Sequence, residues 1–420
     1  MRPVSVLIPN FNGRRHLAEC LGSLQQQRCP AGEIIVFDNG STDGSADFIR
    51  QRFPAVRVLG ASENFGFAGA INRAAEAATG EWLAFLNNDM RAAPEWVAGA
   101  MEHAGRHPCV ASRILNWSGD KVDFDGASLQ YLGFADQVGI GEPASRPSQP
   151  GLILFPCGGA MFIRRDLFLS SGGLDEDYFA VYEDVDLGWR LWLQGHQVFF
   201  SPDSVACHRG HATLDARREE KKRYLMHRNA LFTILKNYGD EAFRKILPAA
   251  LFQSIRRAVR FSGIDKTAFY FWEEQEIAQD PSSLWMLKDA VNHIVVLDDL
   301  LEHWPELMKK RARVQADRKR SDGEILSLFG DPFRRIFKDA NYEEHEAEWI
   351  RHLGILELFP GADPFALTEG FAGDQKREME ALRRELAHLK SRLAEFDGRD
   401  KPPESTIRRL ARRLAQWGIR

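Results

Sequence analysis

The chain has 420 residues, of which 44% are apolar and 27% charged, and its formal net charge is −4. This length favours two domains or one domain with appendages, and the slightly acidic balance excludes a global basic field for binding nucleic acid. The five cysteines are never spaced CxxC, no signal-peptide pattern opens the chain, and the longest apolar run falls short of a bilayer span, so the sequence predicts a cytoplasmic protein.

The N-terminal part alternates between apolar runs and amphipathic segments, as α/β proteins do. Strands are predicted at residues 4–8, 33–37, 56–59 and 81–86, and helices at about 16–26, 41–53 and 69–78. This alternation favours a parallel, doubly wound sheet, in which ligands bind at the carboxyl ends of the strands. Asp38 and the Asn87-Asn88-Asp89 run stand at two of those ends.

The sequence pattern changes after residue 110. Short β-like pieces with Gly and Pro extend to about residue 201, with one helix predicted at about 184–194, and the chain is mostly helical after 217. Apolar and basic residues alternate at helical spacing over 246–260, which fits either a membrane-adsorbed helix or a helix that covers exposed core. Residues 379–396 carry a heptad pattern, and the last stretch is an Arg-rich amphipathic segment behind a polar linker.

A dinucleotide dehydrogenase is the familiar alternative for such an opening. Its GxGxxG fingerprint between the first strand and helix is absent, because the turn here reads Pro-Asn-Phe-Asn-Gly at residues 9–13. The dehydrogenase interpretation is therefore rejected.

Five motifs, in order and at matching spacing, resemble those of family 2 inverting glycosyltransferases of the GT-A fold, most closely the bacterial rhamnosyltransferase-like enzymes. The nucleotide half carries VSVLIPNFNGRRHLAECLGSL, IIVFDNGSTDGS and NFGFAGAINRAAEAATGEWLAFLNND, and the acceptor half carries GGLDEDYFAVYEDVDLGWRLWLQGH and VACHRGHAT. The resemblance covers roughly residues 1–320. It implies a Rossmann-like mixed sheet with a helical C-terminal extension.

The first motif group predicts the nucleotide site. A carboxylate at a strand end can read the imide N–H of a pyrimidine, and both this chemistry and the resemblance assign that role to Asp38; the alternative is that Asp38 only caps the turn after it. Pro9, Asn10 and Phe11 would line the base and ribose, although the same residues also form an ordinary turn. Small residues near a helix start let a ligand approach the backbone. On that basis, donor contacts are also predicted for Asn64, Phe67 and Asn72, with a packed glycine-rich loop as the alternative.

Residues 87–89 occupy the family's metal-binding DxD position, with Asn in place of the first acid. Asp89 is predicted to hold Mg²⁺ or Mn²⁺ with phosphate oxygens and water, since one carboxylate suffices when these complete the shell. Asn87 and Asn88 would then contact the donor sugar or ribose. By resemblance, His208 is a second candidate metal ligand; its alternative is a structural histidine.

The Glu183-Asp184-x-Asp186 run opens a helix among aromatic residues. Acids at a helix start also serve as plain N-terminal caps, because the helix dipole favours them. Resemblance implies that Asp184 is the general base and that Glu183 positions the acceptor, with Asp186 left open as an alternative base. Arg190 is expected to pair with one of these acids.

The predicted organisation places the catalytic domain at 1–235, divided into a nucleotide-binding half (1–105) and an acceptor half (106–235). A helical region (236–370), a short coiled coil (371–397) and a linker with a basic amphipathic helix (398–420) follow. The heptads predict self-association through 379–396, and the basic helix predicts peripheral contact with the inner face of the cell membrane.

The predicted activity is transfer of a sugar from a UDP- or dTDP-sugar to a lipid-linked or growing cell-surface glycan, rhamnosyl transfer included, with no role for nucleic acid. A catalytically decayed scaffold of a polysaccharide assembly complex stays an alternative because of Asn87, and a nucleotidyltransferase remains possible from fold analogy. A processive synthase would need transmembrane helices and a QxxRW element, and the sequence has neither.

Overall fold

The computed structural model describes residues 3–210, 216–262, 288–334 and 340–362. The chain divides into two compact units. The first contains Met1–Phe333 together with Ile350–Pro360, and the remaining residues form the second. All elements described below belong to the first unit except α11 (Ala340–His352), which reaches into the second.

The N-terminal part has the predicted alternation. Its elements are β1 (Val4–Asn10), α1 (Arg14–Gln25), β2 (Glu33–Asn39), α2 (Ser45–Arg52), β3 (Arg57–Ala61), α3 (Gly66–Ala77) and β4 (Trp82–Leu86). β1 pairs in parallel with both β2 and β4, and β2 pairs in parallel with β3. The predicted parallel arrangement is therefore confirmed for these four strands.

Helix α2 begins later than the sequence predicts, at Ser45 instead of residue 41. Ser41 is used elsewhere: its hydroxyl oxygen accepts a hydrogen bond from the Asn12 backbone N–H at 2.9 Å. The Asp43 carboxylate accepts the backbone N–H of Ser45 at 3.1 Å, and Gly44 is left-handed, so the helix can start only after this turn. Ser41 and Asp43, which resemble helix-capping residues in the sequence, thus hold the loop after β2 against the segment that follows β1.

The later strands make the sheet mixed. These elements are β5 (Met90–Ala92), α4 (Trp96–Met101), β6 (Cys109–Asn116), β7 (Val122–Phe124), β8 (Ala127–Leu129), β9 (Ala135–Gln137), β10 (Gly151–Ile153), β11 (Ala160–Arg164), α5 (Arg165–Ser170), η1 (Glu176–Tyr178), α6 (Glu183–Leu193) and β12 (Val198–His208). The main strand order is β10-β12-β6-β11-β4-β1-β2-β3. β11 lies antiparallel between β4 and β6, so the doubly wound parallel pattern ends at β4 and the predicted mixed sheet is confirmed.

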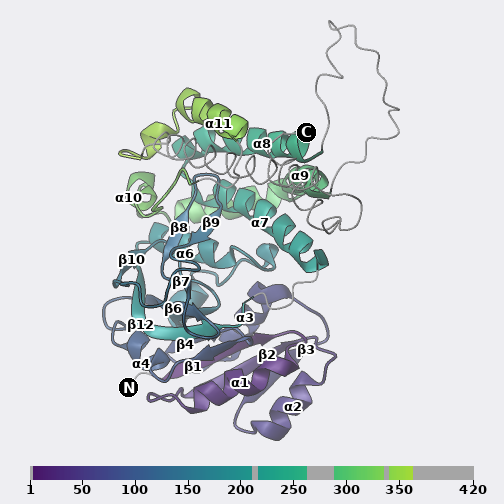
Figure 1. Ribbon diagram of the computed structural model, residues 1–420, viewed down its shortest axis with the longest axis vertical. Coiled ribbons are helices and arrows are strands. Elements are labelled where there is room, and N and C mark those ends of the chain that lie inside the picture. The colour runs from purple at the N-terminus through teal and green to yellow at the C-terminus, as the bar shows by residue number, and fades with distance from the viewer. Residues whose placement is uncertain (1–2, 211–215, 263–287, 335–339, 363–420) are drawn as a thin grey trace, which may run out of the picture. The chain divides into compact units, whose positions relative to one another are not determined.

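The sheet buries side chains on both faces. Val6 and Ile8 of β1 belong to a core cluster with residues of α1, α2 and α4, whereas α3 contacts β1 and β2, and Phe168 of α5 packs edge-on against Phe85. Alternate residues of a strand point to opposite faces, so a continuous apolar run such as that of β1 indicates cover on both sides. Figure 1 shows α1 and α2 alongside the β1–β4 region.

The C-terminal part of the first unit is helical. It contains α7 (Ala216–Asn237), α8 (Asp240–Ser262), α9 (Lys288–Ala316), α10 (Asp322–Leu326) and the short turn η4 (Leu356–Leu358). α9 packs against both α7 and α8, and residue 235, the predicted end of the catalytic domain, lies inside α7. Ile246 and Ala249 of α8 are buried, so the 246–260 segment covers core with this face. Among the described residues, no helix is long and apolar enough to cross a membrane.

The predicted heptads at 379–396 and the basic helix within 398–420 lie outside the described residues.

Candidate active site

The carboxyl ends of β1, β2 and β4 bring together polar residues that are distant in the sequence. Asn10 at the end of β1 is in register with Asp38 of β2. Residues 87–89 directly follow β4, which pairs in parallel with β1 on its other side. Because parallel strands end at the same edge of a sheet, the residues predicted for nucleotide and for metal share one edge.

Asn10 connects the two parts of this edge. Its Nδ2 donates to Asp38 Oδ1 at 3.0 Å, and its Oδ1 accepts a hydrogen bond from Asn88 Nδ2 at 2.8 Å. Only 1% of Asn10 is exposed, so the amide fixes the orientation of its two neighbours within a polar network. Pro9 is partly buried beside it, and Phe11, 48% exposed, leaves its ring open to a ligand.

Hydrogen bonds of the Asn39 and Asn64 side-chain amides fix the loop before helix α3. Asn39 Nδ2 donates to Asn64 Oδ1 at 2.8 Å, and the same oxygen accepts the Gly66 backbone N–H at 2.9 Å. Asn39 Oδ1 in turn accepts the Phe65 backbone N–H at 2.9 Å. The side-chain oxygen of Asn64 therefore shapes the loop, and its predicted donor contact stays a prediction. Asn39 was not among the predicted site residues, although its place at the end of β2, next to Asp38, was a usable signal.

The other two residues predicted to contact the donor, Phe67 and Asn72, lie within helix α3. Asn72 Nδ2 donates to the Leu174 carbonyl at 2.8 Å, and Asn72 Oδ1 accepts the Leu174 N–H at 2.9 Å. Both polar ends of Asn72 thus hold the 174–176 segment. Phe67 lies near Gly158, where a β-carbon would come within 3.3 Å of both its ring and Asp184 Oδ2. Phe67 is consequently close to the predicted base.

The structure brings Asp89 and His208 together, and their predicted role as metal ligands stays a prediction. His208 closes β12, which pairs with β5 just after Asp89, and its Nε2 lies 3.4 Å from Asp89 Oδ2. The other ring nitrogen, Nδ1, lies 2.6 Å from Asp123 Oδ2. Asp123 was not among the predicted site residues. Its alternation with Val122 and Phe124 in β7, both buried, was the only signal, and many other acids share such a pattern.

The electrostatics of this corner suit a cation. Burial would lower the pKa of His208, but the hydrogen bonds and charges of Asp123 and Asp89 outweigh burial and raise its pKa to about 9. Burial would likewise raise the pKa of Asp89, and His208 instead lowers it. With Nδ1 held by Asp123, His208 presents Nε2 to the Asp89 carboxylate, the arrangement in which a second carboxylate orients a metal-binding histidine.

The donor set is small. Within the described residues, no group of three or more His, Cys, Asp or Glu side chains is arranged to hold a metal ion alone. Asp89 and His208 would supply two ligands, and diphosphate oxygens and water would have to complete the shell of a divalent cation. The residues present fit a cation bound together with the nucleotide.

Glu183 and Asp184 open helix α6. Asp184 Oδ2 accepts the Gly158 backbone N–H at 2.7 Å, and Oδ1 accepts the Val185 N–H at 2.8 Å. Burial raises the pKa of Asp184 despite these bonds. Burial and the charge of Asp184 raise the pKa of Glu183 well above its ordinary value. In the described structure, the buried Glu183 Oε2 has no hydrogen-bond partner, so this pair holds two carboxyl groups of raised pKa.

Asp186, the alternative base, is fully buried. Its carboxylate lies 2.8 Å from the Arg190 Nε and 2.8 Å from the Lys236 ammonium. The expected pairing of Arg190 with one of the acids is confirmed. A carboxylate enclosed by two cations cannot reach an acceptor, which leaves Asp184 as the candidate.

A short turn at residues 157–159 joins the two halves of the site. The Gly159 carbonyl accepts the Asn87 backbone N–H at 2.9 Å, and the next residue back, Gly158, donates its N–H to Asp184. Asp184 therefore lies beside the residues that follow β4. The arrangement can hold a nucleotide and a cation on one side and present a carboxylate of raised pKa from the other.

Comparison with known proteins decides the family. Residues 5–170 match the family described as Glycosyl transferase family 2, and residues 136–283 match Glycosyl transferase family group 2. The chain belongs to the family 2 glycosyltransferases. The family match and the mixed sheet together confirm the predicted GT-A type fold and the transferase class.

Known relatives resemble this glycosyltransferase over about half of its chain. It is 27% identical over 240 residues to the N-acetylglucosaminyl-diphospho-decaprenol L-rhamnosyltransferase of Mycobacterium tuberculosis, covering 50% of this chain and 76% of the relative. It is 33% identical over 214 residues to Glycosyltransferase AglE of Haloferax volcanii, covering 49% of this chain and 66% of the relative. The predicted resemblance to bacterial rhamnosyltransferases is confirmed.

Among solved structures, the crystal structure of GalNAc-T7 with UDP, GalNAc and Mn²⁺ is similar with a TM-score of 0.46 and 16% identity, over 64% of this chain and 54% of that one. Because this similarity is low, no functional role is assigned to a residue of this glycosyltransferase from that structure.

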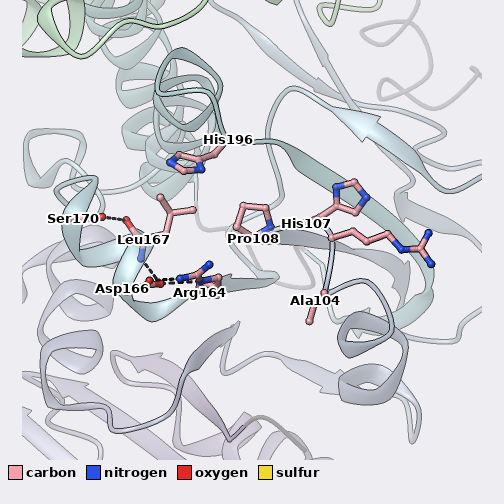
Figure 2. A pocket seen from close by; sticks show the side chains of 10 residues that line it. Ala104, His107, Pro108, Arg164, Asp166, Leu167, Ser170 and His196 are labelled. Carbon is pink, nitrogen blue, oxygen red and sulfur yellow. Dashed lines mark hydrogen bonds and ion pairs between the residues drawn. The ribbon is translucent and has the colours of Figure 1, made fainter.

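A separate cavity of about 470 Å³ contains none of the predicted site residues. Figure 2 shows its lining, in which Arg164 is paired with Asp166, and His107 and His196 lie nearby. Burial lowers the pKa of both histidines, and neighbouring cationic groups lower it further. Two arginines line the cavity: Arg164 is paired with Asp166, and Arg106 is the second.

Gly13, between β1 and α1, sets how closely Asn10 and Asn88 approach. A β-carbon there would lie 2.5 Å from Asn10 Oδ1 and would overlap the Asn88 side-chain nitrogen. Gly13→Ala is therefore expected to separate the two amides and weaken UDP binding about tenfold, since leaving a buried polar group unpaired costs roughly 1–3 kcal/mol. Isothermal titration with UDP measures the change.

Gly22→Ala is the matched control within α1, because no atom lies within 4 Å of its added β-carbon. Alanine is the better helix former, so this variant should bind UDP as the wild type does and unfold at a slightly higher temperature. Unchanged UDP affinity in Gly13→Ala would contradict the assigned role of the Asn10–Asn88 contact.

Proposed function

We propose that this glycosyltransferase moves a sugar from a UDP- or dTDP-sugar to a hydroxyl group of a lipid-linked or growing cell-surface glycan, with inversion at the anomeric carbon. Asp184 is the proposed general base, and Asp89 with His208 is the proposed site of Mg²⁺ or Mn²⁺. The name of the mycobacterial relative, an L-rhamnosyltransferase of a decaprenol-linked N-acetylglucosamine, supports rhamnosyl transfer as the first case to test.

One observation carries the proposal. The 157–159 turn binds the end of β4 through Gly159 and the Asp184 carboxylate through Gly158, by hydrogen bonds of 2.9 and 2.7 Å. A general base must stand beside the donor site to deprotonate an acceptor hydroxyl there, and the bond of this turn to Asp184 supports that role for Asp184. The fully buried Asp186 has no such access.

The proposed reaction is a single displacement. Asp184 takes the proton of the acceptor hydroxyl as its oxygen forms the bond to the anomeric carbon, while the bond from that carbon to the diphosphate oxygen breaks. The electron pair leaves with the nucleoside diphosphate. A bound divalent cation would supply positive charge for the departing diphosphate. Because burial raises the pKa of Asp184, its carboxylate is a stronger base than an exposed one.

Glu183 has a different proposed role. Burial and the charge of Asp184 raise the pKa of Glu183 well above its ordinary value, which favours the protonated form that can donate a hydrogen bond to an acceptor oxygen. A neutral carboxyl next to Asp184 also avoids two adjacent negative charges. Glu183 is therefore proposed to position the acceptor.

The proposal also covers the cellular location of the enzyme, its membrane contact and its self-association. We place it in the cytoplasm, at the inner face of the membrane where lipid-linked acceptors are found, with contact through the basic C-terminal helix and self-association through 379–396. A basic amphipathic helix binds anionic lipid by charge and by burial of its apolar face.

The test is a transfer assay preceded by a binding screen. We expect UDP or dTDP to raise the melting temperature only with Mn²⁺ present, whereas GDP and NADH do not, because a ligand that binds the folded state alone stabilises it by mass action. Purified enzyme is then incubated with dTDP-L-rhamnose or UDP-sugars and a synthetic polyprenyl-diphospho-N-acetylglucosamine. Acceptor-dependent release of nucleotide, with the product anomer identified by NMR, is the expected result.

The controls separate binding from chemistry. Asp89→Asn is expected to remove the Mn²⁺-dependent part of the thermal shift. A shift with NADH alone, or none with any pyrimidine diphosphate, would overturn the donor assignment. Release of nucleotide that ignores the acceptor would overturn the transfer itself.

A further inference from the structure

The loop that leads into the acid pair has an unusual backbone. Phe179 has a φ of 61°, and Val181 and Tyr182 each have a φ of 70°. Residues other than glycine rarely adopt positive φ, and for a β-branched residue such as valine it is a genuine outlier. Tyr182 is the residue before helix α6, so the left-handed stretch ends where Glu183 and Asp184 begin. Surrounding structure must hold it there.

Asn229 of helix α7 provides that hold. Its Nδ2 lies 3.0 Å from the Tyr178 carbonyl oxygen, 2.9 Å from that of Ala180 and 2.6 Å from that of Val181. An amide nitrogen has only two hydrogens, so the three carbonyls share them. No part of Asn229 is exposed, and the loop thus turns around a single buried amide.

Arg228 fixes the amide. Its Nε donates to Asn229 Oδ1 at 3.1 Å, which assigns the oxygen side and leaves Nδ2 to face the loop. The guanidinium also donates through Nη2 to the Asp177 carbonyl at 2.7 Å. Two adjacent residues of α7 therefore bind backbone oxygens of the loop from 177 to 181.

We infer that Asn229 is a positioning residue that holds Asp184 against the Gly158 N–H by fixing the left-handed loop. The inference rests on the proposed role of Asp184 as general base. Without the amide, the Ala180 and Val181 carbonyls lose this donor, the Tyr178 carbonyl keeps only its bonds from the Ala180 N–H and Arg228 Nη2, and the loop is free to relax toward ordinary φ values. The first turn of α6 then moves, and the Gly158 to Asp184 hydrogen bond of 2.7 Å is the contact that reports the movement.

The test uses Asn229→Ala in the full chain. Hydrogen exchange is expected to become faster at the Gly158 and Val185 amides, both of which donate to Asp184. UDP affinity should change less than kcat, because the hydrogen bonds of Asn10 to Asp38 and Asn88 do not involve α7, whereas the loop meets helix α3 where the Phe179 carbonyl accepts the Ala68 N–H at 3.2 Å. Transfer should lose about 10²-fold in kcat with little change in the KM for donor, the cost of an Ångström-scale displacement of a catalytic group.

Thr233→Val is the matched control, one turn further along α7. It removes a buried hydroxyl that lies 2.9 Å from the Tyr178 hydroxyl, but no bond to a loop carbonyl. It should leave exchange at Gly158 and kcat close to wild type. If Asn229→Ala does not fold, Arg228→Met carries the same test, because it releases the Asn229 oxygen and the Asp177 carbonyl.

The outcomes separate this inference from the function. Unchanged exchange at Gly158 in the variant overturns the positioning role, whatever the activity. Faster exchange with an unchanged kcat also overturns it, because Asp184 would then move without consequence. If the wild type binds UDP but transfers nothing, the proposed function fails, and the exchange at Gly158 still decides whether Asn229 fixes Asp184.

Discussion

Asp184→Asn is expected to lower kcat for sugar transfer by about 10²–10⁴-fold, the range that a positioned general base contributes. Asparagine has nearly the same shape and can still accept the Gly158 N–H through its amide oxygen, but it cannot take a proton. The nucleotide edge at Asn10 and Asp38 is untouched, so UDP affinity should stay at the wild-type value. Initial rates at saturating donor and acceptor, together with titration of UDP, measure both.

The pH profile of the wild type provides an independent check. The pKa of Asp184 is raised by burial, and only the ionised form acts as a base. The acid limb of kcat should therefore lie above the ordinary aspartate value of about 3.9, with activity rising as pH increases through it. Asp203→Asn, at an exposed position, is the control and should retain full activity. A kcat for Asp184→Asn above a tenth of wild type would place the base elsewhere.

Lys236→Met is expected to lower the free energy of unfolding by about 3–5 kcal/mol, the cost of leaving buried charge without its partner. The Lys236 ammonium is almost completely buried and lies 2.8 Å from Asp186 and 2.5 Å from Asp175. Arg190 and Lys310 remain near these carboxylates, but two acids would then share less positive charge. Urea denaturation followed by fluorescence of the buried tryptophans measures the loss.

The pH dependence of this deficit has a defined sign. Burial would raise the pKa of Asp175 and Asp186, yet the charge of Lys236, together with Lys310 at Asp175 and Arg190 at Asp186, outweighs burial and holds both below the ordinary value. Their stabilising contribution is therefore present above about pH 4 and is lost as pH falls. The gap between variant and wild type should narrow in acid. Lys309→Met, which removes an exposed pair with Glu306, should leave the urea midpoint unchanged; a gap that widens in acid would contradict the assignment.

Much of the fold could be predicted because local pattern and tertiary role agree. The run of β1 is apolar on successive residues, and the structure covers both faces of that strand. The start of α2 could not be placed, because Ser41 and Asp43 carry capping chemistry that the β1 loop uses instead. The antiparallel direction of β11 also could not be predicted from the local sequence, since strand direction depends on pairing partners far along the chain.

The site likewise contains residues that could be predicted from the sequence and residues that could not. Residues that belong to contiguous motifs, such as Asp38 and Asp89, could be assigned to one sheet edge before the structure was known. Asn72 carries the same kind of motif, yet both ends of its amide bind residue 174 of another segment. Asp123 and Asn229 could not be selected from the sequence. Their roles depend on His208 and on the 178–181 loop, and those contacts exist only in the folded chain.

The antiparallel direction of β11 also has an evolutionary consequence. A strand that runs against its neighbours begins where they end, so the 157–159 turn lies at the edge that collects the ends of β1, β2 and β4. The residues proposed to bind the donor and the proposed base are encoded by separate stretches of the gene, so substitutions after β6 need not shift the register of β1 with β2 and β4. The two glycines of the turn lack that freedom. A β-carbon on Gly159 would come within 3.2 Å of Asn87 Nδ2, and one on Gly158 within 3.3 Å of Asp184 Oδ2, so a substitution at either glycine would press on one side of the proposed site.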